Sequence, residues 1–168
     1  NNIIIDSKSG YSGAGKNIQK KFKFKNLFNS VSAYGVGRHR HVAEINQELS
    51  KIGKKKIKVF FTPHLIPMFR GILSTIYIEI NKNCSAKKIY NLLIKYNKKN
   101  KFIKIAKFNK HIDTGEVMNT NYCKISVCKS VKKNKIIIIS VIDNLIKGAS
   151  GQAVQNMNVA YNFKESTS

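Results

Sequence analysis

A short segment with two histidines and two arginines carries the clearest reactive chemistry of this 168-residue chain. The run Arg38–His41 is followed by apolar residues at helical spacing, which predict a helix over Val42–Ile52. At a helix N-terminus the backbone N–H groups and the macrodipole favour an anion and disfavour an imidazolium. The segment therefore indicates an anion site, and it leaves a histidine of this turn available as a base near neutral pH. Structural histidines are commoner than catalytic ones, so the spacing alone does not decide between these roles.

A loop of small residues near the start of the chain offers a second place for a ligand. The β-branched run Ile3–Ile5 is followed by the loop Asp6–Lys16, which is rich in glycine and serine. Such a loop lets a ligand approach the backbone closely. Its glycine spacing matches neither the Walker motif nor the dinucleotide fingerprint, so on this segment alone a flexible turn is the plainer interpretation.

Both prolines of the chain lie in the segment Phe61–Ile72. Because proline fixes its own φ and restricts the residue before it, the segment is predicted to be a stiff loop between two strands. Such a loop would hold Arg70 in a set direction. The alternative is a rigid hairpin connection with an arginine on its surface.

The apolar run Ile136–Ile142 predicts a strand buried on both faces. The segment Asp143–Asn158 follows, and Gly148 and Gly151 end the strand. Beyond the glycines, apolar residues at helical spacing predict a helix with one apolar face and with small residues at its start.

Taken together and in order, four segments resemble the N-acetyl-gamma-glutamyl-phosphate reductase family of the semialdehyde dehydrogenase superfamily. Four ordered matches are far more specific than any one of them. The chain departs from the family pattern at Ala43, where proline is usual before the glutamate, and this change removes no reacting group. The matching segments are Ser9–Gly15, Tyr34–Ile45, Phe61–Ile72 and Asp143–Asn158.

The resemblance implies NADPH-dependent reduction of N-acetyl-L-glutamyl 5-phosphate to N-acetyl-L-glutamate 5-semialdehyde and phosphate, a step of arginine biosynthesis. In that chemistry a thiolate attacks the acyl carbon, phosphate leaves, and hydride reduces the thioester. A close alternative is the lysine-pathway relative that acts on an aminoadipyl phosphate. No metal site is implied.

The resemblance also implies the residues of the site. By resemblance, His39 is the general acid/base, the substrate-binding residues are Tyr34, Arg40, His41, Glu44 and Arg70, and the cofactor-binding residues are Ser9, Gly10, Ser12, Gly13, Asn144 and Gly148. His41 is expected to point away from the His39 site.

The family's catalytic cysteine, in a Gly-Cys-Tyr-Pro setting, and its N-terminal nucleotide-binding domain have no counterpart in this sequence. None of the three cysteines, Cys84, Cys123 and Cys128, has that setting. We therefore expect the chain to be the C-terminal part of a longer enzyme. An odd number of cysteines without framework spacing favours a reduced, cytoplasmic setting.

The resemblance also divides the chain. Residues 1–15 are expected to be the end of the nucleotide-binding domain with its cofactor loop, and residues 16–147 the catalytic and dimerisation domain. Residues 148–163 are expected to form a helix that packs back on the nucleotide-binding domain, and residues 164–168 a frayed tail.

The composition allows one core of domain size and leaves one other class of function open. The chain is 42% hydrophobic, and no apolar run approaches the roughly 20 residues of a membrane span. The net charge of +23 makes a ribosomal or other nucleic-acid-binding protein the alternative. Against it, the basic residues are almost all lysine, and the three arginines lie in the candidate site. The run Lys16–Lys25, in which Phe22 and Phe24 alternate with lysines, is interpreted as a solvated strand face or loop.

The strand-like segments cluster and few crossover helices separate them, which predicts an α+β fold with a mixed, largely antiparallel sheet and helices on one face. The resemblance implies the same fold, that of a glyceraldehyde-3-phosphate dehydrogenase-like C-terminal domain, in a homo-oligomer whose subunits meet on the other sheet face. Lys132–Asn134 is predicted to be a hairpin turn. The predicted strands are Ile57–Phe61, Ile72–Ile80, Phe102–Phe108, Tyr122–Cys128 and Lys135–Ile142, and the predicted helices are Val42–Ile52 and Ser85–Tyr96.

Overall fold

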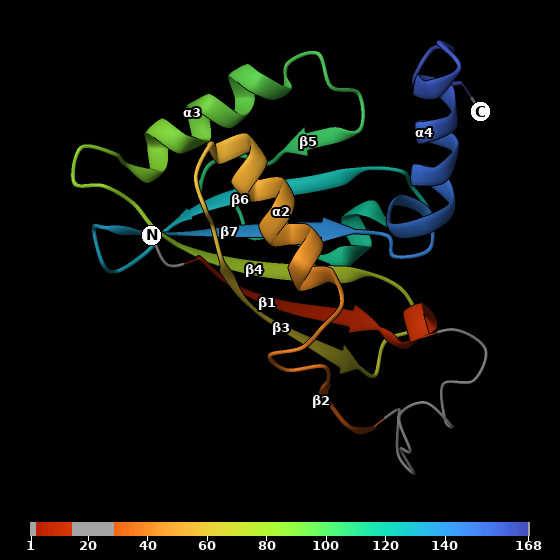
Figure 1. Cartoon of the computed structure of the whole chain (residues 1–168), viewed down its shortest axis with the longest axis horizontal. Coiled ribbons are helices and arrows are strands. Elements are labelled where there is room, and N and C mark those ends of the chain that lie inside the picture. Colours follow the sequence, from red (N-terminus) through yellow and green to blue (C-terminus); the bar gives the residue numbers. More distant parts are fainter. Residues whose placement is uncertain (1–2, 15–28, 168) are drawn as a thin grey trace.

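The computed structural model describes residues 3–14 and 29–167, and in these ranges the chain forms one seven-stranded sheet with the strand order β2-β3-β1-β4-β7-β6-β5 (Figure 1). The charged run Lys16–Lys25 and the predicted boundary between residues 15 and 16 lie outside the described residues. The strands are β1 Ile3–Gly10, β2 Ser32–Ala33, β3 Val59–Ile66, β4 Ile72–Glu79, β5 Ile103–Ile105, β6 Cys123–Lys129 and β7 Lys135–Ile142. The helices are α2 His41–Gly53, α3 Ala86–Asn97 and α4 Gly151–Ala160, with short helical turns η1 Tyr11–Ala14, η3 Thr114–Val117 and η4 Ile146–Ser150.

The sheet is mixed, as predicted. The β1–β3 and β5–β6 pairs are parallel, and the other neighbouring pairs are antiparallel. The β6–β7 connection is the predicted hairpin turn, in which the Lys135 N–H donates to the Lys132 carbonyl over 3.0 Å. The predicted α+β class is therefore confirmed.

β1 is longer and more central than predicted. The sequence indicates a strand only at Ile3–Ile5, yet the strand runs on to Gly10 and pairs over its length with β3 and β4. Ladder hydrogen bonds on both sides offset the poor strand propensity of Asp6 and its serine neighbours. Inside the sheet, the Ser7 and Ser74 hydroxyls lie 2.8 Å apart. By its pairing, β1 is thus an internal strand of this sheet.

β3 also differs from its prediction, because it extends through Pro63, which was expected in a loop. The Pro63 carbonyl accepts the Tyr34 N–H over 3.1 Å, so this backbone edge of Pro63 faces β2 and not β1. β2 pairs with β3 only at Leu65 and His64, so the missing N–H of the proline breaks no ladder bond. The stiff loop therefore shrinks to residues 67–71. At the other edge, β5 ends at Ile105, three residues short of its prediction.

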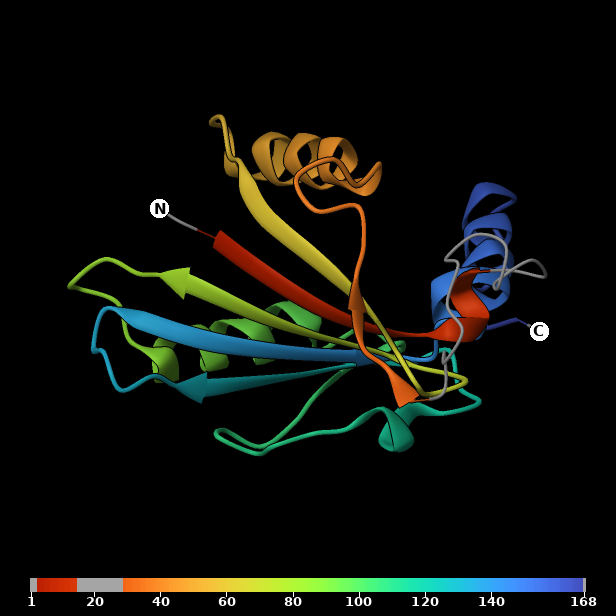
Figure 2. The same cartoon turned by 90° about the horizontal axis from the view of Figure 1, so that it is seen from below.

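Both long helices of the central region lie over the same face of the sheet, as predicted (Figures 1 and 2). α2 packs on β3, where the Asn46 side chain accepts the Val59 N–H over 2.9 Å, and α3 packs on β5 and β6. The opposite face is covered near β7 by the segment that contains η3. There, Ile112 and Val117 are buried against Val141.

The rest of that opposite face carries exposed apolar side chains. Ile4 is directly paired with both Phe60 and Tyr77, and the three side chains are 44%, 66% and 41% exposed. They form a contiguous apolar patch over β3, β1 and β4, which we call the open face. Patches of this kind on a folded domain mark contact surfaces.

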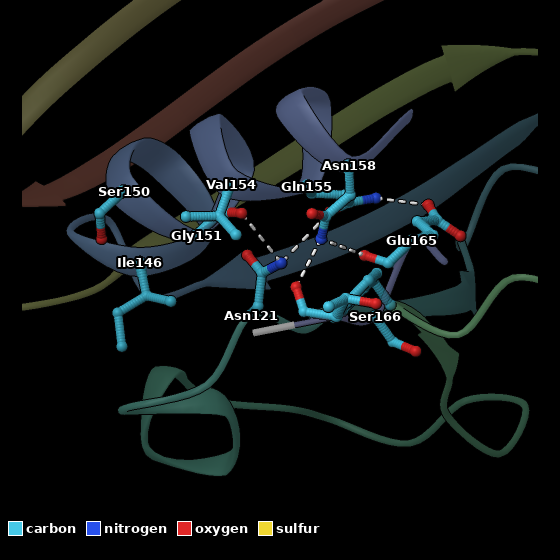
Figure 3. A pocket seen from close by; sticks show the side chains of 11 residues that line it. Asn121, Ile146, Ser150, Gly151, Val154, Gln155, Asn158, Glu165 and Ser166 are labelled. Atoms are coloured by element: carbon cyan, nitrogen blue, oxygen red, sulfur yellow. Dashed lines mark hydrogen bonds between the residues drawn. The ribbon is translucent and has the colours of Figure 1, made fainter. Parts of the chain in front are cut away.

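The C-terminal tail does not fray as predicted. Asn158, which is 2% exposed, donates to the Thr167 carbonyl over 2.5 Å, and the Gln155 amide donates to the Glu165 carboxylate over 2.6 Å. Figure 3 shows these side chains around a cavity of about 240 Å³ between α4 and the tail, with Asn121 reaching into it. The tail is held in place because side-chain amides of α4 donate hydrogen bonds to a backbone carbonyl and to a carboxylate of the tail.

The η3 segment is tied to the sheet by Glu116, and this contact predicts a pH dependence of stability. The hydrogen bond from Lys124, with a second from Lys110, lowers the pKa of Glu116 from 4.5 to about 2. The stabilisation is therefore complete above about pH 4.5 and is lost as the pH falls toward 2. We expect Glu116→Gln to lower the melting temperature at pH 7 and to match the wild type near pH 2. Glu79→Gln, which removes an exposed pair with Lys135, is the control and should have little effect at either pH. A constant Glu116→Gln deficit across this pH range would contradict the interpretation.

Candidate active site

His39 lies in the loop that enters α2, and three rings surround its imidazole. The ring centroids of Tyr34, His41 and Phe61 are 5.6, 4.9 and 5.2 Å from that of His39. The His41 N–H donates to His39 Nδ1 over 3.3 Å. This bond favours the neutral tautomer with its proton on Nε2, which leaves Nε2 as the nitrogen for proton exchange.

The surroundings keep His39 neutral. Partial burial, together with the charges of His41 and Arg40, lowers the pKa of His39 below its ordinary 6.5. Burial raises the pKa of Tyr34, so its phenol stays protonated next to the imidazole. The prediction of a neutral histidine at this helix entrance agrees with the geometry.

The other residues predicted at this helix entrance are more exposed. α2 begins at His41, with Arg40 as its N-cap residue and Glu44 in its first turn, and all three are exposed. The prediction that His41 points away from His39 is wrong, because the two rings pack edge to face. A backbone hydrogen bond closes this turn and brings the two side chains together.

A second group of predicted residues meets where β1 and β7 end. The Asn144 side chain, on a residue that is 6% exposed, accepts the Gly71 N–H over 2.6 Å and donates to the Ser12 hydroxyl over 2.9 Å. A Cβ on Gly13 would lie 3.4 Å from the Asn144 amide nitrogen and 3.5 Å from the Ser9 hydroxyl. Residues far apart in the sequence thus form one polar, small-residue surface, as the resemblance implied.

Gly10 is required by a close approach of two backbones. It donates to the Gly71 carbonyl over 2.8 Å, and a Cβ at Gly10 would lie 2.7 Å from the Phe69 carbonyl oxygen. Backbone atoms cannot yield to such a contact, so only glycine fits. Gly10 therefore sets the position of the loop that carries Arg70 against η1.

Arg70 is held by two residues that the sequence analysis did not single out. Its Nη1 lies 3.4 Å from the Asp143 carboxylate and donates to the Asn119 side chain. Arg70 Nε is buried and has no hydrogen-bond partner in the described part of the chain. The sequence does carry one signal for Asp143, which is its position. It directly follows the strand predicted to be buried and precedes Asn144, a predicted cofactor-binding residue.

The η4 turn carries Gly148 and brings in further polar residues that the sequence analysis missed. The Gly148 N–H donates to the Asp143 carbonyl over 3.0 Å in a π-type turn. The Lys147 ammonium donates to Gln155 over 2.6 Å, and burial lowers the pKa of Lys147. A Cβ on Gly151 would lie 2.5 Å from the Asn121 side chain, so the small residue at the start of α4 allows tight packing there.

Of the three cysteines, Cys123 is in an environment that disfavours a thiolate. Cys123 lies 3.4 Å from the Ser140 hydroxyl, and burial raises its pKa. Cys128 is buried on the other face of β6, and Cys84 precedes α3, where its thiol faces only the Ser85 carbonyl at 4.0 Å. Within residues 3–14 and 29–167 no three metal-ligating side chains cluster.

The mixed sheet and the two groups of candidate site residues point to one class of protein, and comparison with known families agrees. The model of the family described as semialdehyde dehydrogenase, dimerisation domain, matches residues 1–144. The chain therefore belongs to the semialdehyde dehydrogenases.

Comparison with curated proteins is more specific. The N-acetyl-gamma-glutamyl-phosphate reductase of Staphylococcus saprophyticus is 45% identical over 166 residues, which cover 99% of this chain and 48% of that protein. The reductase of the same name from Thermoanaerobacter pseudethanolicus is also 45% identical, over the same shares of both chains. The chain thus spans about half the length of the curated relatives it matches.

Solved structures support the fold. Aspartate semialdehyde dehydrogenase II from Vibrio cholerae matches with a TM-score of 0.71 at 17% identity, covering 97% of this chain and 56% of that one. The enzyme from Francisella tularensis matches with a TM-score of 0.70 at 14% identity, covering 95% and 57%. At these identities the likeness concerns the fold.

Proposed function

We propose that this chain forms the proton-transfer and ligand-positioning part of an NADPH-dependent N-acetyl-gamma-glutamyl-phosphate reductase. The whole protein would reduce N-acetyl-L-glutamyl 5-phosphate to the semialdehyde, in the arginine pathway and in the cytoplasm. The observation that carries the proposal is the 45% identity over 99% of this chain to reductases of that name. No helix in residues 3–14 and 29–167 is long and apolar enough to cross a membrane.

The nucleophile of this reaction is proposed to come from outside the described segment. A thiolate must form near neutral pH, and burial opposes this at Cys123, whose pKa is raised. His39 would then act on that incoming thiol and on the oxygen that develops negative charge, as acid and base in turn. Tyr34 packs against the imidazole and orients it, and Glu44 and His41 line the same helix entrance.

Arg70, Arg40 and His41 are proposed to bind the phosphate of the substrate. Arg70 is the best placed of the three, because its Nη1 is fixed while its Nε lacks a partner within the described residues. Charge-assisted donors of this kind stabilise a leaving phosphate.

The surface formed by Ser9, Gly10, Ser12 and Gly13 with Asn144 and Gly148 fits the nicotinamide half of the cofactor. Small residues allow close approach, and an amide and hydroxyls match a carboxamide. NADPH supplies the hydride when it is bound. The preference for NADP over NAD rests on the family resemblance.

A second copy of this chain is the proposed partner, because the exposed apolar patch of Ile4, Phe60 and Tyr77 on the open face suits a subunit contact. The alternative of a nucleic-acid partner is less well supported, since two of the three arginines are in the His39 turn and the third is held by Asp143.

The first prediction concerns the reaction itself. The full-length protein should reduce NADP when it is given N-acetylglutamate semialdehyde and phosphate, and the isolated 168-residue chain should not. Turnover by the isolated chain would mean that one of its own cysteines is the nucleophile. Cys84→Ser, Cys123→Ser and Cys128→Ser variants would then identify it, and no turnover by the full-length protein would refute the proposed activity.

The second prediction assigns the acid/base. In the full-length protein, His39→Asn should lower kcat by roughly 10²–10⁴-fold with little change in KM, while His41→Asn should cost distinctly less. The acidic limb of the wild-type pH–rate profile should lie below pH 6.5, because the base must be neutral and its pKa is lowered. A dead His41→Asn enzyme beside a nearly normal His39→Asn enzyme would reverse the assignment.

The third prediction tests the phosphate contact. Arg70→Lys should keep a positive charge near Asp143 but lose the planar fork, so KM for the acyl phosphate should rise about 10-fold or more. KM for NADPH should change much less. Unchanged constants would return Arg70 to a purely structural role.

A further inference from the structure

We propose that Asp143 is a positioning residue that fixes the anion-binding arginine and the cofactor-binding segment in one geometry. This inference rests on the proposed function and extends it, because the family resemblance gave Asp143 no role.

The Asp143 carboxylate is fully buried and is surrounded by N–H donors. Oδ1 accepts the Leu145 and Ile146 N–H groups over 2.8 and 3.0 Å, and Oδ2 accepts the Asn119 N–H over 2.8 Å. Arg70 Nη1 lies 3.4 Å from Oδ2. A buried carboxylate requires such compensation, so each of these partners is held in place by the charge at the centre.

The contacts close into a ring. Arg70 meets Asp143 through the ion pair, Asp143 is bonded to Asn144 in the chain, the Asn144 side chain accepts the Gly71 N–H over 2.6 Å, and Gly71 follows Arg70. Neither segment can move without the other. The same Asn144 donates to the Ser12 hydroxyl, which extends the ring to the cofactor surface.

Asn119 is the second support of the arginine. It adopts a left-handed backbone conformation with φ of 61°, its N–H is fixed by Asp143, and its side chain accepts from Arg70 Nη1. The Nη1 side of the guanidinium is therefore occupied by protein groups. Nε, on the other side, is buried and lacks a partner in the described residues, so it is the Arg70 donor that no described protein group satisfies.

An amide cannot replace this carboxylate. Asp143→Asn puts an NH₂ group against either the Leu145 and Ile146 N–H groups or the Asn119 and Arg70 donors, and it removes the charge that pairs with Arg70. In the full-length protein we expect a rise of about 10²-fold in KM for the acyl phosphate, a smaller rise in KM for NADPH, and the smallest change in kcat.

The decisive measurement is a double-mutant cycle with Arg70→Lys. If Asp143 acts through Arg70, adding Asp143→Asn to Arg70→Lys should raise KM for the acyl phosphate far less than it does in the wild type. Fully additive effects would overturn the proposal. The matched control is Asp113→Asn, which removes the charge of the exposed N-cap residue of η3 without touching Arg70 and should leave both KM values unchanged.

A second variant keeps the test valid if Asp143→Asn does not fold. Asn119→Gly retains the N–H that Asp143 binds and tolerates the positive φ, but it removes the contact with Arg70. This variant should raise KM for the acyl phosphate and leave KM for NADPH unchanged. If both KM values stay unchanged, the proposed role of Asn119 is refuted.

Inorganic phosphate gives a readout that does not depend on turnover. Phosphate should raise the melting temperature of the wild-type protein, and Asp143→Asn and Arg70→Lys should abolish this shift. A wild type that phosphate stabilises through Asp143, but that does not turn over the acyl phosphate, would refute the proposed function and support the positioning role. Equal phosphate stabilisation of the wild type and Asp143→Asn would refute the positioning role.

Discussion

One buried charge determines how this end of the sheet is built. The Asp143 carboxylate has no exposure to solvent, so every hydrogen-bonding position around it must be filled by the protein. Those positions are filled by the start of η4, by the Asn119 backbone and by Arg70. Three segments separated in the sequence therefore meet at a fixed distance from β7, and the polar surface of the site is built on this arrangement.

Glycines supply the complementary constraint, because side chains would prevent these segments from meeting. Gly10 lets η1 approach the loop before β4, and Gly71 adopts a φ of +115° with Thr114 packed where a Cβ would lie. Since Gly71 also donates to Asn144, its backbone conformation and its hydrogen bond are needed together. The glycines and the buried carboxylate thus solve the same problem, which is to bring polar backbone groups close and to give the N–H groups of Gly71, Asn119, Leu145 and Ile146 acceptors.

The hydrophobic periodicity of the sequence correctly predicted elements that bury one face. The bounds of other strands depend on pairing between strands that are far apart in the sequence. α2 and β7 agree with their predictions within about one residue, since their apolar patterns are strong. β1 and Pro63 were mispredicted because neighbouring strands, and not local propensity, place them in the sheet. The family resemblance named Ser12, Gly13 and Asn144, but only the folded chain shows the Asn144–Ser12 hydrogen bond and the close approach of Gly13 to the Asn144 amide. Asp143 was missed because its role depends on contacts with Arg70 and Asn119. These residues are far from Asp143 in the sequence, so no local sequence pattern links them to it.

The two parts of the candidate site, around Asn144 and around His39, differ in how many of their polar groups have partners within the chain. The Asn144 side chain is hydrogen-bonded to Gly71 and Ser12, so the surface around it is held in place by contacts within the chain. Around His39 the imidazole contacts rings and one backbone N–H, and no thiol of the described residues adjoins it. Under the proposed function the His39 group therefore needs an incoming nucleophile, whereas the Asn144 group already has its hydrogen-bond partners within the chain. α4 leads away from the Asn144 group and exposes apolar side chains such as Met157 and Tyr161, at 48% and 71%. Under the proposed function, this apolar surface beside the candidate site is where the part of the enzyme that carries the nucleophile would pack.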